Sequence, residues 1–433
     1  MKKFTLLLLV ATSFSAFAKL AIVHDFQIEP DVFTNLTKKN KKQFLKELKD
    51  VKGDERVLSA PQSPAETYYW QHLSTHSGYA GVQAEKAYSE LPLNNAQEVI
   101  VAVIDSGVDI QHEDLEGKIW VNTLEIPDNG IDDDNNGYID DINGWNFIGG
   151  KDGKNIDADS LEVAREVARL TTLKAQRQAL GYDLSSAEEA LLNKVRAEVN
   201  LNLKEGNEVL HEYEAQLDLF TTNEAFLLEN TELTEVTAES LNDLISVNEE
   251  VNQAKKVILA ILADYGSKSR IKAVINYYSD IVNYYYNPSY DPRAEIVGDD
   301  YLNPADRYYG NNDVTGPDSS HGTHVAGIIA ANRENEIGVK GIASNVKIMA
   351  VRAVPNGDER DKDVANAIIY AVNNGAQIIN MSFGKAYSPY KNLVDEAVAY
   401  AASKGVLLIK AAGNACSNHA LDHHFPNDAS FDR

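Results

Sequence analysis

The sequence predicts an α/β domain built on a doubly wound parallel sheet, with a long helical insertion. Three observations carry this prediction. Four short apolar runs rich in β-branched residues are spread along the chain. Amphipathic helical patterns separate the last three runs. Residues 157–291, in contrast, contain no β-rich run until their end and are rich in Leu, Ala, Glu and Lys.

The apolar runs lie at residues 99–104, 346–351, 377–381 and 406–409. Continuous apolar runs of this length are typical of strands that are buried on both faces of a parallel sheet. Apolar residues at helical spacing between the last three runs end at Gly375 and Gly405, the expected left-handed caps. Strand–helix–strand alternation indicates βαβ units.

Within residues 157–291 the apolar residues recur at helical spacing, which predicts antiparallel helices packed on the main domain. Two interpretations of this insertion stay open. It is a module that gates substrate or docks a partner, or it is an insertion that a surface loop tolerates at little cost. Its tyrosine cluster, residues 277–286, either binds a glycan or packs with wet hydroxyls.

The first residues have the pattern of a secretory signal peptide spanning residues 1–18. Lys2 and Lys3 precede a short apolar run, and Ala16-Phe17-Ala18 offers a small-x-small cleavage site. The apolar run is too short to span a bilayer, and no later stretch is long and apolar enough to do so. The protein is therefore expected to be secreted, to the periplasm or the exterior.

Residues 19–66 are either a propeptide or an N-terminal arm, and residues 67–433 form the main domain. The first of these segments contains a basic cluster, residues 38–42. The net charge of −25 argues against nucleic acid as a partner. The single cysteine, Cys416, excludes an intrachain disulfide.

Four motifs follow strands or open a helix. Asp105 ends the first strand, where α/β sheets place their sites, although Asp-Ser-Gly alone also suits a turn. His321 begins His-Gly-Thr-His-Val-Ala-Gly at a helix start, a position suited to a general base. His324 could pair with it around zinc, but no third ligand is evident, so His324 is expected in the core.

The other two motifs follow later strands. Ser382, Phe383 and Gly384 offer a backbone edge on which an extended peptide can add as a strand. Asn414, after Ala-Ala-Gly, can donate its side-chain amide to a developing oxyanion.

Together these motifs resemble those of the subtilase family of serine peptidases, over residues 70–156 and 301–433. The resemblance implies a subtilisin-type sheet, a catalytic domain acting on protein or peptide substrates, and no organic cofactor. It implies that His321 is the general base, oriented by Asp105, and that Asn414 is the oxyanion donor. Residues 382–384 would line the substrate groove.

One departure from the family concerns the nucleophile. The family's serine lies in a Gly-Thr-Ser-type motif after the oxyanion asparagine, and the sequence contains no Gly-Thr-Ser. The chain is therefore expected to be an inactive fragment of a serine endopeptidase, cut before the serine. The alternatives are a pseudopeptidase that acts as a secreted peptide-binding protein, and a calcium-dependent structural protein of the cell surface.

An acidic loop at residues 128–141 suggests structural calcium. Asp132, Asp134 and Asn136 occupy the first, third and fifth positions of a calcium loop, and Tyr138 could offer its carbonyl. The twelfth-position glutamate is absent, so the loop is not an EF-hand. The alternative is a solvated acidic turn.

Overall fold

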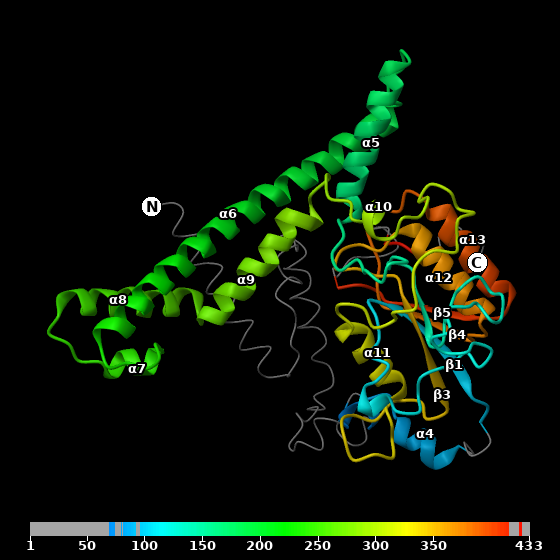
Figure 1. Ribbon diagram of the computed structural model, residues 1–433, viewed down its shortest axis with the longest axis horizontal. Coiled ribbons are helices and arrows are strands. Elements are labelled where there is room, and N and C mark those ends of the chain that lie inside the picture. The colour runs from blue at the N-terminus through cyan, green and yellow to red at the C-terminus, as the bar shows by residue number, and fades with distance from the viewer. Residues whose placement is uncertain (1–68, 74–78, 80, 92–95, 415–423, 427–433) are drawn as a thin grey trace, which may run out of the picture.

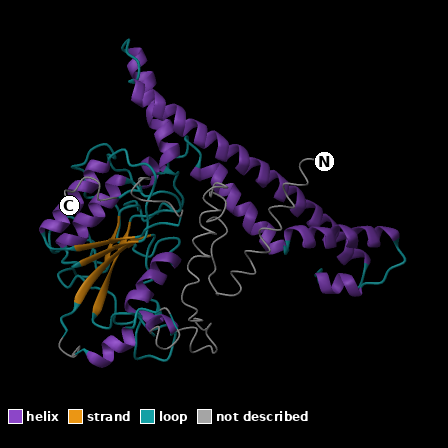
Figure 2. Ribbon diagram, turned by 180° about the vertical axis from the view of Figure 1, so that it is seen from behind, coloured by secondary structure: helices purple, strands orange, loops and turns teal. Residues whose placement is uncertain are grey.

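The computed structural model describes residues 69–73, 79, 81–91, 96–414 and 424–426. A parallel sheet with helices on both faces forms the body of the molecule, and a helical arm projects from it (Figure 1, Figure 2). This is the predicted fold class. The proposed signal peptide, the basic cluster and Cys416 lie outside the described residues.

Five strands make the sheet in the order β2-β3-β1-β4-β5, and every neighbouring pair is parallel. The strands are β1 Val99–Asp105, β2 Gly144–Asn146, β3 Val346–Arg352, β4 Ile378–Met381 and β5 Leu407–Lys410. The four predicted runs all form strands. Strand β2 was not predicted, because three residues are too few to show a period.

The central strand β1 is buried on both faces, which explains its continuous apolar run. Ala102 and Ile104 pack in the core beneath α12 (Asp361–Asn373) and α13 (Lys391–Ser403). Val101 and Val103 pack in the core beneath α11 (Ser320–Ala330). Successive side chains of a strand point to opposite faces, so each core receives alternate residues of β1.

Three helices cover the sheet and lead into or out of its carboxyl edge. They are α11 Ser320–Ala330, α12 Asp361–Asn373 and α13 Lys391–Ser403. Gly375 and Gly405 follow α12 and α13 with φ values of 85° and 76°, which confirms the predicted left-handed caps. Short helical segments lie at Trp70–His72, Ala84–Glu90 (α4), Glu113–Leu115 and Arg293–Ile296 (α10).

Strand β5 differs from the expectation of burial on both faces. Leu408 packs into the core beneath α12 and α13, but Leu407 and Ile409 are each about half exposed. Adjacent residues of a strand face opposite ways, so one face of β5 is uncovered among the described residues. An apolar run of four residues cannot reveal which of its faces is covered.

The insertion forms an arm whose helices pack mainly on one another rather than on the main domain (Figure 1). Its elements are α5 Glu162–Ala179, α6 Ser186–Asn230, α7 Ala238–Asp243, α8 Glu249–Tyr265, α9 Lys268–Asp280 and a π-helix at Ile281–Tyr285. Its largest apolar cluster, centred on Ile258 and Ile261, contains residues of the insertion alone.

The arm leaves and re-enters the body at one place. The backbone N–H of Leu161, just before α5, donates to the carbonyl of Tyr285 at the end of the π-helix, at 2.8 Å. A capping box at Ser185 and Glu188 begins the long helix α6. The distal helices α8 and α9 both contact α6 (Figure 1).

The separate apolar cluster predicts that the arm loses stability independently of the body. Ile258→Ala removes a fully buried side chain and should cost about 2–5 kcal/mol locally. Hydrogen exchange followed by mass spectrometry should then show faster exchange in α6, α8 and α9, with the strands unchanged. Ile104→Ala, in the body, should give the reverse pattern. Equal acceleration everywhere in both variants would show a single cooperative unit instead.

Candidate active site

The structure brings Asp105 and His321 together. Asp105 is the last residue of β1 and is 3% exposed, while His321 is the second residue of α11. Nδ1 of His321 lies 2.7 Å from Oδ1 of Asp105. The carboxyl end of a buried strand and the start of a helix, far apart in the sequence, thus meet in one polar contact.

Two glycines permit this approach. A Cβ on Gly322 would lie 2.0 Å from the carbonyl oxygen of Gly107, so only glycine fits against this loop. Gly107 itself has a φ of 139°, which side-chain-bearing residues rarely adopt. Thr323 then fixes the helix start, because its Oγ1 accepts the backbone N–H of Asp109 at 2.8 Å.

The hydrogen bond defines the chemistry of the imidazole. An ionised carboxylate only accepts, so Nδ1–H of His321 donates to Asp105 and leaves Nε2 of the neutral ring as the acceptor. The hydrogen bond to Asp105 raises the pKa of His321; partial burial opposes this, and the charges of Asp105 and Asp318 add to it. The His321 side chain is 60% exposed, so a reacting group can reach the ring.

Arg352, which the sequence reasoning missed, supports the loop after β1. It pairs in register with Asp105 at the end of β3 and is almost completely buried. Its guanidinium donates to the carbonyl of Ser106 at 2.7 Å and also to the carbonyl of Ile156. An arginine ending an apolar strand was the available signal, but its partners are set by the tertiary fold.

The predicted substrate edge follows β4. The side-chain amide of Asn380 donates to the hydroxyl of Ser382 at 2.9 Å. No backbone hydrogen bond involves Ser382, Phe383 or Gly384 within the described part of the chain. At the next residue the edge is occupied, since the backbones of Lys385 and Phe425 pair in an antiparallel bridge.

Asn414 lies in the loop after β5, at the same carboxyl edge as Asp105 and Ser382. Its side chain is exposed, and no hydrogen bond joins it to Asp105 or His321 in the residues described. The structure therefore places Asn414 at the expected edge without bringing it into contact with the pair.

His324 is not the core residue that was expected. It lies on the exposed face of α11, one turn from His321. Helix α11 buries Gly322, Ala326 and Ala330 instead, so its core-facing stripe lies on the opposite side of the helix from the two histidines.

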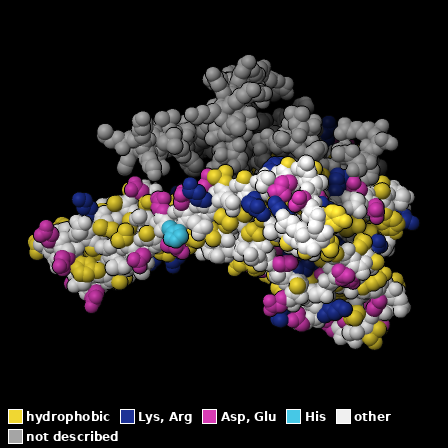
Figure 3. All heavy atoms as spheres, turned by 90° about the horizontal axis from the view of Figure 1, so that it is seen from above, with side chains coloured by type: hydrophobic (Ala, Val, Ile, Leu, Met, Phe, Trp, Pro, Cys, Tyr) yellow, Lys and Arg dark blue, Asp and Glu magenta, His cyan; other side chains and the backbone are white. Residues whose placement is uncertain are grey.

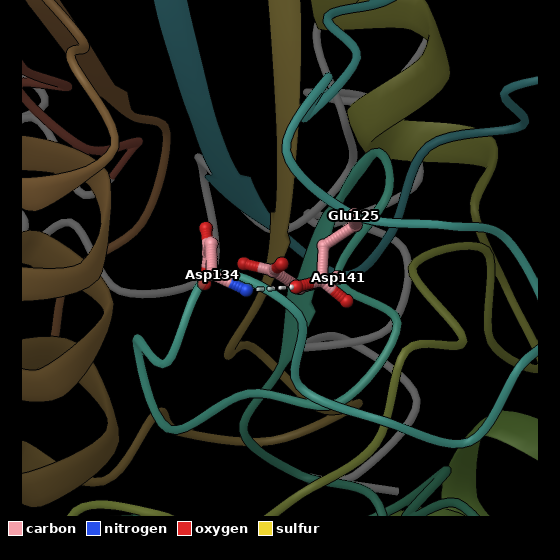
Figure 4. A group of neighbouring side chains, drawn as sticks. All are labelled: Glu125, Asp134 and Asp141. Carbon is pink, nitrogen blue, oxygen red and sulfur yellow. Dashed lines mark hydrogen bonds between the residues drawn. The ribbon is translucent and has the colours of Figure 1, made fainter.

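The acidic loop gathers three carboxylates. Oxygen atoms of Glu125, Asp134 and Asp141 lie within 4.8 Å of one another, and Glu125 and Asp141 are buried (Figure 4). The side-chain amides of Asn122 and Asn136 each donate to both Asp134 and Asp141. Among the described residues no ion pair involves these carboxylates, and the side-chain groups that donate to them include the neutral amides of Asn122 and Asn136.

Only part of the predicted ligand set belongs to this group. Asp134 is in it, and Asn136 reaches it through its amide. The carboxylate of Asp132 instead accepts the backbone N–H groups of Asn136 and Gly137, which closes the turn. The N–H of Tyr138 donates to the side-chain oxygen of Asn136. Glu125 and Asp141 were missed because Glu125 precedes the loop and Asp141 ends it, so neither occupies a ligand position of the calcium-loop spacing.

A buried ion network joins the arm to the substrate edge. The ammonium of Lys385 lies 2.7 Å from Glu162, in the first turn of α5, and 2.8 Å from Asp361, in the first turn of α12. Burial alone would raise the pKa of Glu162, but the charges of Arg165 and Lys385 outweigh it and lower that pKa to about 2. Further buried pairs are Arg360–Asp159, Arg293–Asp363 and Lys362–Asp299.

The fold and the paired side chains define an α/β protein with a hydrogen-bonded carboxylate–imidazole pair at the carboxyl edge of a parallel sheet. The family model described as the subtilase family matches residues 96–430. The chain belongs to the subtilase family.

Similar proteins match shorter stretches. The thermophilic serine proteinase of Bacillus sp. (strain AK1) is 41% identical over 131 residues, 30% of this chain and 30% of that protein. Thermitase of Thermoactinomyces vulgaris is 42% identical over 98 residues, 22% of this chain and 34% of that protein. The solved structure of the prenylagaramide maturation protease PagA, 34% identical, covers 22% of this chain and 35% of that chain with a TM-score of 0.20. The chain thus spans about a third of these relatives' lengths.

The 2.7 Å contact predicts the titration of His321. Asp105→Asn should lower the pKa of His321, because the hydrogen bond to a carboxylate favours the charged ring. Asp318→Asn, the matched control, should lower this pKa less, since Asp318 acts only through its charge. NMR titration of the ring, assigned by its loss in His321→Gln, measures both shifts. An unchanged pKa in Asp105→Asn would contradict the pairing.

Proposed function

We propose that this chain supplies the acid–base half of a serine-type endopeptidase. The observation that carries the proposal is the hydrogen bond between a buried carboxylate, Asp105, and an accessible imidazole, His321. This geometry leaves Nε2 of His321 free to accept the proton of a serine hydroxyl. Membership of the subtilase family supports the same reaction class.

The acylation half of the proposed reaction proceeds through two proton transfers at Nε2, and deacylation repeats both with water as the nucleophile and the serine oxygen as the leaving group. As serine oxygen bonds to the peptide carbonyl carbon, His321 takes the hydroxyl proton, and the carbonyl oxygen becomes an oxyanion. His321 then returns the proton to the leaving amine as the C–N bond breaks. Asp105 holds the tautomer and stabilises the imidazolium between these steps, and Asn414 is proposed to donate its amide to the oxyanion.

The substrate is proposed to bind as an added strand along residues 382–384. The backbone N–H and C=O groups of these residues form no hydrogen bond with other backbone groups in the described structure, whereas Lys385 is already paired with Phe425. Main-chain hydrogen bonds of this kind hold extended peptides with little dependence on sequence. The paired residue limits how far a substrate can extend along this edge.

The nucleophilic serine is proposed to come from outside the described residues. No serine hydroxyl is bonded to His321 among them, and the printed sequence has no Gly-Thr-Ser. Export through residues 1–18, and either a propeptide or an arm at residues 19–66, are part of the same proposal. Of the helices that the structure describes, none is both long and apolar enough to cross a membrane.

A fluorophosphonate probe tests the reaction class, because it labels only an activated serine. If the reading frame continues into a Gly-Thr-Ser segment, the longer protein should label and the 433-residue chain should not. In the longer protein, His321→Ala should reduce the rate of peptide hydrolysis by about 10⁴–10⁶-fold. His324→Ala, one turn away and exposed, should leave it unchanged. A longer protein that binds peptides but never labels would be a binding protein.

We also propose that Glu125, Asp134 and Asp141 hold a structural Ca²⁺. These three carboxylates fit a hard cation that prefers oxygen ligands. Two of them are buried, and none forms an ion pair with another described residue. A bound ion would offset the repulsion among these charges. It would also connect the loop to the start of β2, which lies three residues after Asp141.

Calcium should therefore raise the melting temperature of the chain. At a hundredfold excess over the dissociation constant the expected stabilisation is about 2.7 kcal/mol. Asp134→Asn should remove most of the calcium-dependent shift in differential scanning calorimetry. Asp128→Asn, in the same loop but outside the carboxylate group, should keep it. The absence of any shift in the unaltered chain would leave a solvated acidic turn.

A further inference from the structure

One stretch of the arm carries charge of one sign only, although α8 and α9, which pack against it, also carry lysines and an arginine. From Glu205 to Glu250, every Asp, Glu, Lys or Arg is an acid. This stretch covers most of α6, all of α7 and the first two residues of α8. We call residues 205–250 the acidic arm.

Charge is balanced differently where the end of α5 meets the start of α6. There, Lys174 and Arg177 on α5 pair with Glu189 and Glu188 on α6, at 2.8 and 2.6 Å. In the acidic arm, two carboxylates form ion pairs among the described residues. These are Lys204–Glu208 at 4.0 Å and a pair between Lys268 and Glu224. The remaining carboxylates are left to water and to hydrogen bonds such as Tyr265–Glu212.

Apolar side chains are exposed within the same stretch. Leu219 and Leu228 are partly exposed on α6, on opposite sides of the helix because they are nine residues apart. Ile245 and Val247 are almost completely exposed in the turn between α7 and α8. Figure 3 shows hydrophobic and acidic side chains intermixed along the arm.

The same chain contains a segment of complementary chemistry. Residues 38–52 hold the densest lysine cluster of the sequence, Lys38-Lys39-Asn40-Lys41-Lys42, followed by three further lysines and only two acids. Apolar residues recur within it at Phe44, Leu45, Leu48 and Val51. A basic segment with an apolar stripe matches an acidic surface with exposed apolar residues, in both charge and hydrophobicity.

We propose that the acidic arm binds the basic segment, residues 38–52, of its own chain. The residues between Lys52 and Tyr69 can span at most roughly 55–60 Å, which limits the part of the arm that the segment can reach. A tethered segment binds at a high effective concentration, so modest contacts hold it. The interaction is independent of the proposed catalytic reaction.

A zero-length carbodiimide cross-linker, which joins lysine amines to carboxylates in contact, tests the proposal on the full 433-residue chain. Mass spectrometry should find cross-links between residues 38–52 and acids of residues 205–250. In an equimolar mixture of ¹⁴N and ¹⁵N chains, these should join residues of the same isotope. Raising NaCl to about 0.5 M should reduce them several-fold, since salt screens exposed charges.

Two sets of variants separate binding from chance proximity. Reversing Lys38, Lys39, Lys41 and Lys42 to Glu should reduce the cross-links at the remaining lysines at least tenfold. Reversing Lys86 and Lys404, exposed on the main domain, should not. Ile245→Ser with Val247→Ser should weaken them without loss of folding, because both side chains are exposed.

Three outcomes would overturn the proposal. Cross-links between isotopes would show that two copies bind each other instead. Cross-links from the basic segment to the main domain alone would place it elsewhere. Cross-links that persist in high salt and in the lysine-reversed variant would show that charge complementarity does not hold the segment.

Discussion

The structure depends on the position of β1 inside the sheet. This strand is paired with β3 on one side and β4 on the other, and both of its faces are covered. Asp105, at its end, is therefore buried, whereas the imidazole of its partner His321 is exposed. Glycine at positions 107 and 322 lets α11 approach closely enough for His321 to meet it. A carboxylate held this way orients the ring without needing to move during a reaction.

The distribution of charge follows the same logic of burial. Where the arm meets the body, acids and bases are paired and dry, as in the network of Lys385, Glu162 and Asp361. Removing one member would leave a buried charge without a partner, which is far costlier than losing an exposed pair. Away from this contact, ion pairs among the described residues reach two acids of the acidic arm, Glu208 and Glu224, and none of the three carboxylates around Asp134. The net charge of −25 is thus concentrated where solvent, an ion or a basic partner can offset it.

Sequence patterns revealed the features that are local or periodic. The four apolar runs became strands, Gly375 and Gly405 became caps, and the residues that follow strands met at one edge. Features fixed by tertiary contacts were missed. Arg352 donates to carbonyls far from it in the sequence, and Lys385 pairs with Phe425, 40 residues away. Glu125 and Asp141 join Asp134 through the folding of the loop, at spacings that no motif records. The exposed sides of β5 and of His324 depend on which helices cover them, and no local spacing records that.

The hydrogen bond between Leu161 and Tyr285 means that the chain returns to its point of departure after the whole arm. To the body, the insertion is equivalent to a short loop between β2 and α11. Such an element can be gained in a single genetic event and lengthened or exchanged later, since closing a longer loop costs little. Among the described residues, the first turn of α5 with Glu162 and Arg165 contacts the body, and so does α6, where Glu198 accepts a hydrogen bond from the hydroxyl of Tyr387. Diversification of the arm beyond these contacts can therefore proceed without altering the Asp105–His321 pair.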